Sequence, residues 1–538
     1  MNYKKTAIKN LFKQNPLWIL FGTICVFVTS YSLALSANYI RHITDHIQHV
    51  GLNGLWFLIF MACITQVIHY ITKFGLAVSC QQLSFRLCKY IRINLLECWL
   101  HIPFAEFERK QVGQYISIAQ NDANNASFYV YVVFSRISMS VFNVLMPLPF
   151  MIQIDFGLTV IVLVVSLSFG AINQRILTKI KINESNARKS QEDITNTALN
   201  GFDSADSITN YNASTYMQNL YNKVRLRYSK ALLSNAKIDG ARNGFYVIVQ
   251  NTTLYGSIIF LAYRTIIGSS TLGETLAFNI LLTQALVAIE MIYRWSGSVV
   301  RCNASWERLE ANFELNVVSK ELCNYDASDA DMVSINNLTF GYTNDKALFN
   351  NFSMKFDKGK IYRISGDSGS GKTTLIKCLL GLYRAENAQY ILNDRESTQD
   401  EIARLVSFVP SEHYLFQGSI FDNLSLGNEK ITKEGCLQMA DTLGVGDWLR
   451  GLNGQLEYVI EAEGRNLSGG QRQSLCILRA LLFKRPILIL DEPFSALDSE
   501  RESRLIKVLN GLKKNYMILI TSHRTQTLDF CDGLIALD

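Results

Sequence analysis

Charged residues are few in this sequence, and none of its cysteines has the spacing of a paired site. Asp, Glu, Lys and Arg make up 18% of the 538 residues, whereas apolar residues make up 49%. The 11 cysteines include no C-x-x-C pair, which argues against a zinc site and a disulfide framework. The net charge of +6 is mild, and no basic run is interleaved with aromatic residues. Nucleic acid is therefore not an expected partner.

Long apolar stretches dominate the first part of the chain. A bilayer-spanning helix needs about 20 apolar residues, and six stretches near that length lie at 17–40, 55–80, 128–150, 156–174, 245–267 and 272–293. Arg136, Glu274 and Glu290 fall within the third and the sixth of them. A buried core helix would explain any one of these runs, but six in succession predict a membrane domain.

The positions of lysine and arginine predict which side of the membrane each end occupies. Lys4, Lys5, Lys9 and Lys13 precede the first apolar stretch, with no acidic residue among the first sixteen. The segments 81–127 and 175–243 are also rich in Lys and Arg. Because cytoplasmic segments carry the excess of positive charge, we expect the N-terminus and both long segments to be cytoplasmic.

The sequence changes character near residue 310. Residues 311–331 are polar and irregular, and after them apolar strands, glycine-rich turns and helices alternate. This alternation is typical of a soluble α/β domain. We therefore expect a transmembrane domain at 1–310, a linker at 311–331 and an α/β domain at 332–538.

A glycine-rich loop in the second domain has the pattern of a phosphate site. GDSGSGKTT (366–374) follows the strand KIYRIS and precedes an apolar helical stretch, which is the strand-to-helix context of the G-x-x-x-x-G-K-[ST] loop. Lys372 would reach the phosphates of ATP and the Thr373 hydroxyl would hold Mg²⁺. The expected ATP-binding residues of this loop are Gly366, Asp367, Ser368, Gly369, Ser370, Gly371, Lys372, Thr373 and Thr374. The predicted fold is an all-α six-helix transmembrane domain followed by an α/β P-loop ATPase domain.

Two further motifs point to the same chemistry. Four apolar residues end in Asp491 and Glu492, where a metal ligand and a general base are needed beside bound phosphates; the alternative is a strand that runs into an acidic turn. Between the two motifs, Leu467, Ser468, Gly469, Gly470 and Gln471 form LSGGQ, with a helix expected to begin near Gln471. It is a second phosphate-binding helix N-terminus in one domain.

The order of these motifs resembles the ATPase domain of ABC transporters, and the six apolar spans are similar to the membrane domain of ABC exporters. The resemblance implies that each ATP lies between one subunit's phosphate loop and the LSGGQ of a second subunit. It also implies that Tyr342 stacks on adenine, although a core aromatic is the alternative. His523 would contact the γ-phosphate as the switch histidine, Glu492 would polarise the attacking water, and Asp498 would contact the opposite subunit.

One position departs from the family pattern. Family members usually carry glutamine directly after the Val-Pro that ends a strand, where it coordinates Mg²⁺ and faces the attacking water, but this chain has Ser411. A hydroxyl is shorter and lacks the amide, so it would reach the metal only through a water molecule or after loop movement. Glu412 would stand in if the loop slipped by one residue. We interpret the loop as an altered site.

These features together predict an ATP-driven exporter of the bacterial inner membrane. One chain carries one membrane domain and one ATPase domain, so a homodimer is the simplest completion. The family members most similar in build are bacterial exporters of antibacterial peptides such as microcins, which implies a small peptide or other amphipathic cargo. A multidrug or lipid exporter, and an ATP-gated channel or regulatory subunit with little hydrolysis, remain as alternatives.

Two groups of residues are expected to serve transport. Segments 103–113 and 206–214 are candidate tips that contact the ATPase domain, with ordinary solvated turns as the alternative. Polar residues in the spans line the cargo path or form interhelix hydrogen bonds; they are Arg136, Asn143, Gln250, Asn251, Asn279, Gln284 and Glu290.

Overall fold

The computed structural model divides the chain into two compact units. The first contains Met1–Leu100 and Lys110–Asn316, and the second contains His101–Arg109 and Val317–Asp538. The structure describes residues 3–49, 55–108, 112–313, 330–342, 347–367, 369–495, 499–522 and 529–537.

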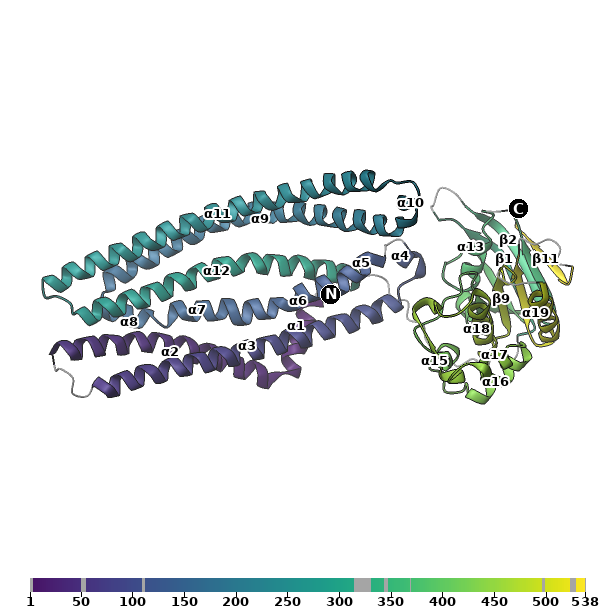
Figure 1. Ribbon diagram of the computed structural model, residues 1–538, viewed down its shortest axis with the longest axis horizontal. Coiled ribbons are helices and arrows are strands. Elements are labelled where there is room, and N and C mark those ends of the chain that lie inside the picture. Colours follow the sequence, from purple (N-terminus) through teal and green to yellow (C-terminus); the bar gives the residue numbers. More distant parts are fainter. Residues whose placement is uncertain are drawn as a thin grey trace. The chain divides into compact units, whose positions relative to one another are not determined.

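The first unit consists of long helices (Figure 1). Its elements are α1 (Tyr3–Gln14), α2 (Pro16–His49), α3 (Leu55–Leu100), α5 (Val112–Ser117), the π-helical η1 (Ile118–Asp122), α6 (Ala123–Val130), the π-helical η2 (Tyr131–Ile137), α7 (Ser138–Leu145), α8 (Leu148–Ile154), α9 (Phe156–Asp203), α10 (Ala205–Asn210), α11 (Ser214–Ile266) and α12 (Leu272–Phe313). The expected apolar stretches fall on these helices, with a turn at 146–147 inside the third. Because α3, α9 and α11 have 46, 48 and 53 residues, they extend well beyond the roughly 20 residues that cross a bilayer.

The apolar helices of this unit have the length and composition of membrane spans. Five described segments qualify, namely Pro16–Ile47, Leu55–Leu100, Gly113–Ile154, Ser214–Ile266 and Leu272–Phe313. The remaining expected stretch begins α9, in which Phe156–Val165 forms a shorter apolar segment. The predicted class, a helical membrane domain followed by an α/β domain, is confirmed.

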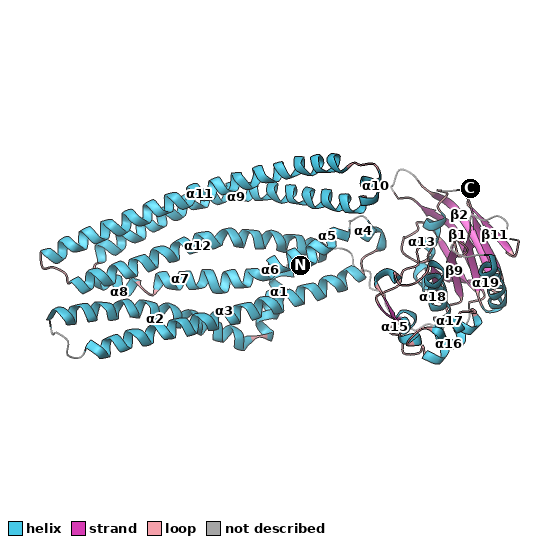
Figure 2. Cartoon of the chain, in the orientation of Figure 1, coloured by secondary structure: helices cyan, strands magenta, loops and turns pink. Residues whose placement is uncertain are grey.

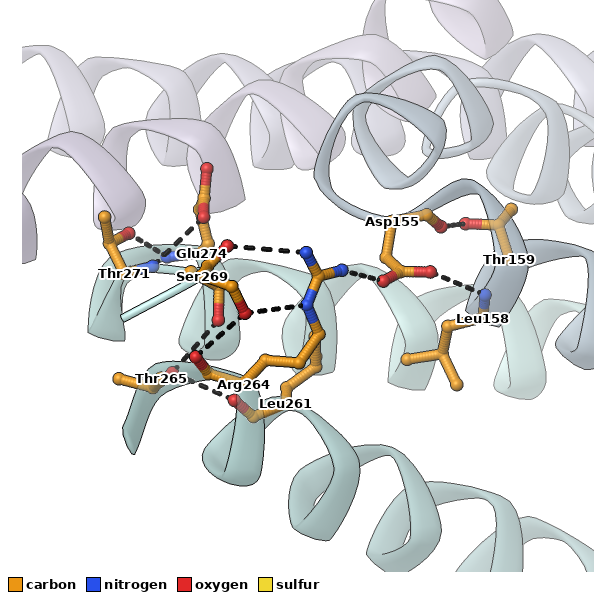
Figure 3. Close-up of polar contacts among 10 residues, drawn as sticks. Asp155, Leu158, Thr159, Leu261, Arg264, Thr265, Ser269, Thr271 and Glu274 are labelled. Atoms are coloured by element: carbon orange, nitrogen blue, oxygen red, sulfur yellow. Dashed lines mark hydrogen bonds and ion pairs between the residues drawn. The ribbon is translucent and has the colours of Figure 1, made fainter. Parts of the chain in front are cut away.

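Polar side chains cluster at the end of this unit where α8 leads into α9 and α11 leads into α12 (Figure 3). Asp155 accepts a hydrogen bond from the Leu158 N–H at 2.7 Å, which caps α9, and it also pairs with Arg264 of α11. Arg41 of α2 pairs with Glu274 of α12 at 2.6 Å. Each of these charges thus has a partner, which lowers the cost of placing it near an apolar bundle.

The second unit contains all the strands among the described residues (Figure 2). Its strands are β1 (Met332–Phe340), β2 (Phe349–Asp357), β3 (Ile361–Ser365), β4 (Gln389–Leu392), β5 (Arg395–Ser397), β6 (Val406–Val409), β7 (Gly418–Ser419), β8 (Val459–Ile460), β9 (Ile487–Asp491), β10 (Met517–Thr521) and β11 (Gly533–Ala536). Its helices are α4 (Phe104–Glu108), α13 (Lys372–Leu379), α14 (Gln399–Arg404), α15 (Ile420–Ser425), α16 (Lys433–Thr442), α17 (Gly446–Gly451), η4 (Gln455–Glu457), η5 (Ala462–Gly464), α18 (Gly469–Leu482), α19 (Ser499–Leu512) and η6 (Lys513–Asn515).

A parallel sheet forms the centre of this unit. Its strand order is β11-β3-β10-β9-β6, and every pairing in it is parallel. β9 (ILILD) and β10 (MILIT) are almost continuously apolar and buried, as expected for strands covered on both faces. A separate antiparallel sheet has the order β2-β1-β4-β5.

Candidate functional site

The loops that follow four neighbouring parallel strands meet at one edge of the central sheet. Thr521 at the end of β10 pairs with Ile364 of β3 on one side and with Asp491 of β9 on the other. Val409 at the end of β6 pairs with Leu490 of β9. Because parallel strands place their carboxyl ends together, the motifs after β3, β6, β9 and β10 share this edge, where α/β sheets bind ligands.

The phosphate loop needs glycine at positions where a side chain would not fit. A Cβ on Gly366 would lie 2.3 Å from the Ser370 Oγ and 2.8 Å from the Leu537 carbonyl oxygen. Gly371, which precedes α13, has φ +97° and would place a Cβ 2.9 Å from the Phe349 ring. Backbone N–H groups can therefore approach a phosphate closely at the N-terminus of this helix.

The polar side chains of the loop fit a nucleotide phosphate. Lys372, the first residue of α13, donates to the carbonyl oxygens of Gly366 at 2.6 Å and Asp367 at 3.1 Å. Its ammonium thus lies over the loop, where a phosphate would be held. The Ser370 Oγ is buried and has no hydrogen-bond partner among the residues that the structure describes, so a ligand atom in the loop would satisfy it. The Thr373 side chain is exposed.

Tyr342 lies next to the phosphate loop. Its hydroxyl is 2.7 Å from the Thr374 hydroxyl, and its ring meets the Tyr383 ring edge-on with centroids 5.7 Å apart. The residue is nevertheless 58% exposed, which leaves ring surface available to an aromatic ligand. This exposure does not fit the alternative interpretation of Tyr342 as a core aromatic.

Asp491 and Glu492 are held by a threonine that the sequence motifs do not single out. The Thr521 hydroxyl donates to the Asp491 Oδ1 at 2.5 Å, and the Glu492 N–H lies 3.0 Å from the Thr521 Oγ1 and 3.2 Å from its carbonyl oxygen. Glu492 has φ +51°, a left-handed conformation that costs energy for a non-glycine residue and is common at functional sites. The position of Thr521, two residues before His523, is the signal that sequence reasoning could have used.

The loop after β6 places its three polar residues differently. Ser411 and Glu412 are exposed, whereas His413 is half-buried and its Nε2 meets no hydrogen-bond partner within the described ranges. Burial, with a smaller contribution from the nearby Arg472, lowers the pKa of His413 below its usual value. His413 is therefore neutral near pH 7, and the exposed Ser411 and Glu412 are the residues open to a ligand.

The LSGGQ segment caps a helix. The Ser468 Oγ accepts from the Gln471 N–H at 3.3 Å, and the Gln471 Oε1 accepts from the Ser468 N–H at 2.8 Å. This reciprocal capping box starts α18 at Gly469, two residues before the expected start near Gln471, because the Ser468 side chain replaces a missing backbone partner. Leu467 and Gly470 are buried.

Gln473 of α18 links this helix to the turn after Glu492. Its Nε2 donates to the Pro493 carbonyl oxygen, and its side chain is 1% exposed. Sequence reasoning missed this contact, because it joins two motifs that lie apart in the sequence.

The short helix α4 belongs to the second unit although it lies far from it in sequence. Glu108 accepts a hydrogen bond from Lys377 at 2.7 Å and another from the Tyr383 hydroxyl. The Phe104 ring lies 6.3 Å from the Tyr383 ring. Tyr383 thus contacts both Tyr342 and α4.

Three of the predicted site residues, Ser368, Asp498 and His523, lie outside the described residues. In the described part of the chain, no cluster of three His, Cys, Asp or Glu side chains could hold a metal ion by itself. A divalent cation near Thr373 and Asp491 would therefore need further oxygen ligands, which nucleotide phosphates provide.

Comparisons with known proteins match both parts of the chain to ABC transporters. The ABC transporter transmembrane region family matches residues 17–289, and the ABC transporter family matches residues 349–495. A probable ABC transporter ATP-binding/permease protein of Haemophilus influenzae is 25% identical over 97% of this chain and 94% of its own length. The alpha-hemolysin translocation ATP-binding protein HlyB of Escherichia coli O157:H7 is 30% identical over 54% of this chain and 42% of its own length.

A solved structure has the same fold. It is a bacterial Atm1-family ABC exporter with ATP bound, which matches with a TM-score of 0.84 and 16% identity over 99% of this chain and 94% of its own. The chain belongs to the ABC transporter family. It is an exporter-type half-transporter with a fused membrane domain and ATPase domain, and it couples ATP hydrolysis to transport.

Proposed function

We propose that two copies of this chain form an exporter that moves a small peptide or another amphipathic compound out of the cytoplasm across the bacterial inner membrane. The observation that carries the proposal is the presence of two phosphate-binding helix N-termini, at α13 and α18, in an ATPase domain fused to membrane-spanning helices. One curated relative is named for alpha-hemolysin translocation, which supports a cargo of peptide character.

The dimer accounts for both phosphate-binding turns. The loop before α13 binds the phosphates of one ATP, and the Ser468 turn of the second copy covers that ATP from the opposite side. Exposed apolar residues on the paired helices α9 and α11 support a partner there; they are Leu199, Phe202, Tyr216, Leu220, Leu226, Leu232 and Leu233. Apolar patches of this kind mark protein contacts. Asp498 contacts the other copy in this scheme.

Each ATP is bound and hydrolysed by the residues of the sheet edge. Tyr342 stacks on the adenine, Lys372 contacts the β- and γ-phosphates, and Thr373 and Asp491 hold Mg²⁺, which neutralises charge on the phosphates. Glu492 polarises the attacking water, with His523 on the γ-phosphate. Ser411 reaches this site only weakly, because its short hydroxyl replaces an amide.

Tyr383 gives a route from the nucleotide to the membrane domain. Its ring contacts Tyr342, and its hydroxyl donates a hydrogen bond to Glu108 of α4. α4 lies in segment 103–113, so we propose that this segment is one transmitting tip. Segment 206–214, which contains the end of α10, is proposed as the second.

Asn143 and Gln284 of the spans are proposed to line the cargo path. The Asn143 Oδ1 and the Gln284 Oε1 are buried and form no hydrogen bond with any described residue. The Arg136 guanidinium lies 5.3 Å from the centroid of the Trp295 ring, and its Nε has no hydrogen-bond partner in the described part of the chain. Asn279, in contrast, accepts a hydrogen bond from Ser257 at 2.9 Å, which is the interhelix alternative.

The test is ATPase activity of the purified protein in lipid discs across a panel of peptides, drugs and lipids. Stimulation by peptides supports the proposal, and stimulation by drugs or lipids alone assigns the multidrug or lipid alternative. Transport into inverted vesicles by the parent protein, but not by Glu492→Gln, shows the direction of movement. Hydrolysis that responds to none of these compounds, with no transport, would favour a channel or regulatory subunit.

A further inference from the structure

A cavity lined by both polar and apolar side chains lies between the N-terminal helix α1 and helix α3. Its volume is about 410 Å³, and its polar lining consists of Asn10, Gln14 and Asn15 from the α1 end and Arg86, Lys89 and Tyr90 from α3. None of these residues belongs to the ATP site or to the proposed cargo path. The cavity therefore calls for a separate explanation.

The packing of α1 fixes the position of this cavity. Ala7 and Leu11 are buried in a cluster with Leu83 and Leu87 of α3. At the end of α1, Asn15 is only 5% exposed; its Nδ2 donates to the Leu11 carbonyl oxygen at 2.9 Å, and its Oδ1 accepts from Arg86. The arginine is thus tied to the turn between α1 and α2.

The charge around the cavity is positive and not neutralised. No ion pair within the described residues involves Arg86 or Lys89. α1 adds the exposed Lys9 and Lys13 and carries no acidic residue in its first turn. One Arg86 nitrogen donates a hydrogen bond to Asn15. The guanidinium has further N–H donors that an oxyanion could accept.

The cavity lies where the amphipathic helix α1 is followed by the apolar helix α2. Pro16 begins α2, and Leu17 and Leu20 directly after it are 79% and 60% exposed. Phe12 of α1 and Ile93 of α3 also expose apolar side chains near the same residues. In the proposed orientation this boundary is at the cytoplasmic surface of the membrane, where basic pockets beside apolar helices suit lipid headgroups.

We infer that this cavity binds the headgroup phosphate of an anionic phospholipid from the cytoplasmic leaflet. Arg86 and Lys89 contact the phosphate, and the amides of Asn10 and Gln14 contact the polar part of the headgroup. The acyl chains lie along the exposed side chains of Leu17 and Leu20. These apolar residues favour a lipid over a free anion, which would not cover them.

The experiment compares lipid binding by the full-length protein and two charge-matched double variants. Arg86→Gln with Lys89→Gln removes both cations of the cavity, and Lys9→Gln with Lys13→Gln removes two exposed cations of α1 that do not line it. Each protein is titrated with phosphatidylglycerol in neutral detergent micelles, and bound lipid is counted by native mass spectrometry. The cavity variant is expected to bind about tenfold or more weakly, and the control variant within a few-fold of the parent.

Further arms separate a lipid from other occupants. Phosphatidylcholine tests the need for net negative charge, and glycerophosphoglycerol, which lacks acyl chains, tests the need for the lipid. Equal binding of phosphatidylglycerol by the parent and the cavity variant would overturn the proposal, as would equal affinity for the chain-free headgroup. Loss of the dimer in the cavity variant would instead assign the cavity to a second copy.

Thermal unfolding shows whether each variant is folded and whether the lipid stabilises it. Phosphatidylglycerol should raise the Tm of the parent and of the control variant, but not that of the single variant Lys89→Gln to the same extent. An equal rise in all three would also contradict the inference. Neither readout depends on cargo or on ATP, so failure here leaves the proposed export function standing, and the reverse also holds.

Discussion

The Thr521 hydroxyl donates a hydrogen bond to the Asp491 carboxylate at 2.5 Å, across two neighbouring strands of the central sheet. The same hydroxyl accepts from the Glu492 N–H at 3.0 Å. One buried threonine therefore orients the proposed metal ligand and the backbone of the proposed general base.

Replacing Thr521 by valine should slow hydrolysis while ATP binding changes little. Valine keeps the shape but removes the hydroxyl, so Asp491 loses its hydrogen bond and the Glu492 N–H keeps only the Thr521 carbonyl oxygen. We expect turnover to fall by about tenfold to a hundredfold. Thr521→Ser retains a hydroxyl and should stay within a few-fold of the parent. Steady-state ATPase rates and nucleotide affinity measure the two effects; a valine variant with normal turnover would remove Thr521 from this role.

Glu492→Gln should bind ATP normally and hydrolyse it at least roughly a hundredfold more slowly. Binding depends on the phosphate-loop amides, whereas the chemical step needs the carboxylate. The variant should accumulate as an ATP-bound closed dimer, visible by size-exclusion chromatography with trapped nucleotide. Undiminished hydrolysis would show that another group polarises the water.

Lys372→Ala should weaken nucleotide binding itself. The ammonium lies 2.6 Å from the Gly366 carbonyl oxygen, over the phosphate loop, and its loss removes a direct contact to phosphate. We expect ATP affinity to fall by about tenfold or more, measured by fluorescent-nucleotide titration. Normal affinity would contradict the assignment of this loop to ATP.

Ser411→Gln should raise basal hydrolysis several-fold, on the order of 1 kcal/mol of barrier, with little change in ATP affinity. The amide would help to order Mg²⁺ and the attacking water, which a short exposed hydroxyl does poorly. Ser411→Ala should differ only modestly from the parent in the same lipid environment.

Two results would change the assignment of Ser411. Loss of turnover in Ser411→Ala, without a gain in Ser411→Gln, would make the serine a ligand in its own right. Loss of turnover in Glu412→Gln alone would show that Glu412 carries the role.

Glu108→Gln should reduce stimulation by cargo several-fold and leave basal hydrolysis near that of the parent. The substitution replaces the charged contact to Lys377, 2.7 Å away, on the route through Tyr383. Tyr383→Phe, which keeps the ring against Tyr342 but removes the hydroxyl, should have a similar effect. Equal stimulation in all three proteins would exclude this route.

The pH dependence of this contact follows from the pKa of Glu108. Burial raises that pKa, but the hydrogen bonds from Lys377 and Tyr383 and the charge of Lys377 outweigh it, so the net pKa is lowered. A lowered carboxyl pKa stabilises the contact above the usual glutamate value, and the contact is lost as the pH falls through the lowered pKa. Glu108 therefore stays ionised between about pH 6 and 8, and it should cause no change in cargo stimulation over that range.

The sequence by itself determined the features that arise from neighbouring residues. The glycines of 366–371 allow the tight turn before α13, LSGGQ caps its own helix, and long apolar stretches require helices because a bilayer leaves backbone groups without other partners. The membrane domain and the phosphate loop could therefore be predicted from local spacing alone. Even the start of α18 was misplaced by only two residues.

The tertiary structure alone decided which distant residues meet. Thr521 lies 30 residues from Asp491, Glu108 lies 275 residues from Tyr383, and Arg86 lies 71 residues from Asn15. The first contact depends on the order of strands in the sheet, the second on the packing of α4 within the second unit, and the third on the burial of α1 against α3. Such contacts leave no periodic signal in the sequence, because long-range packing, rather than local backbone preference, brings the partners together.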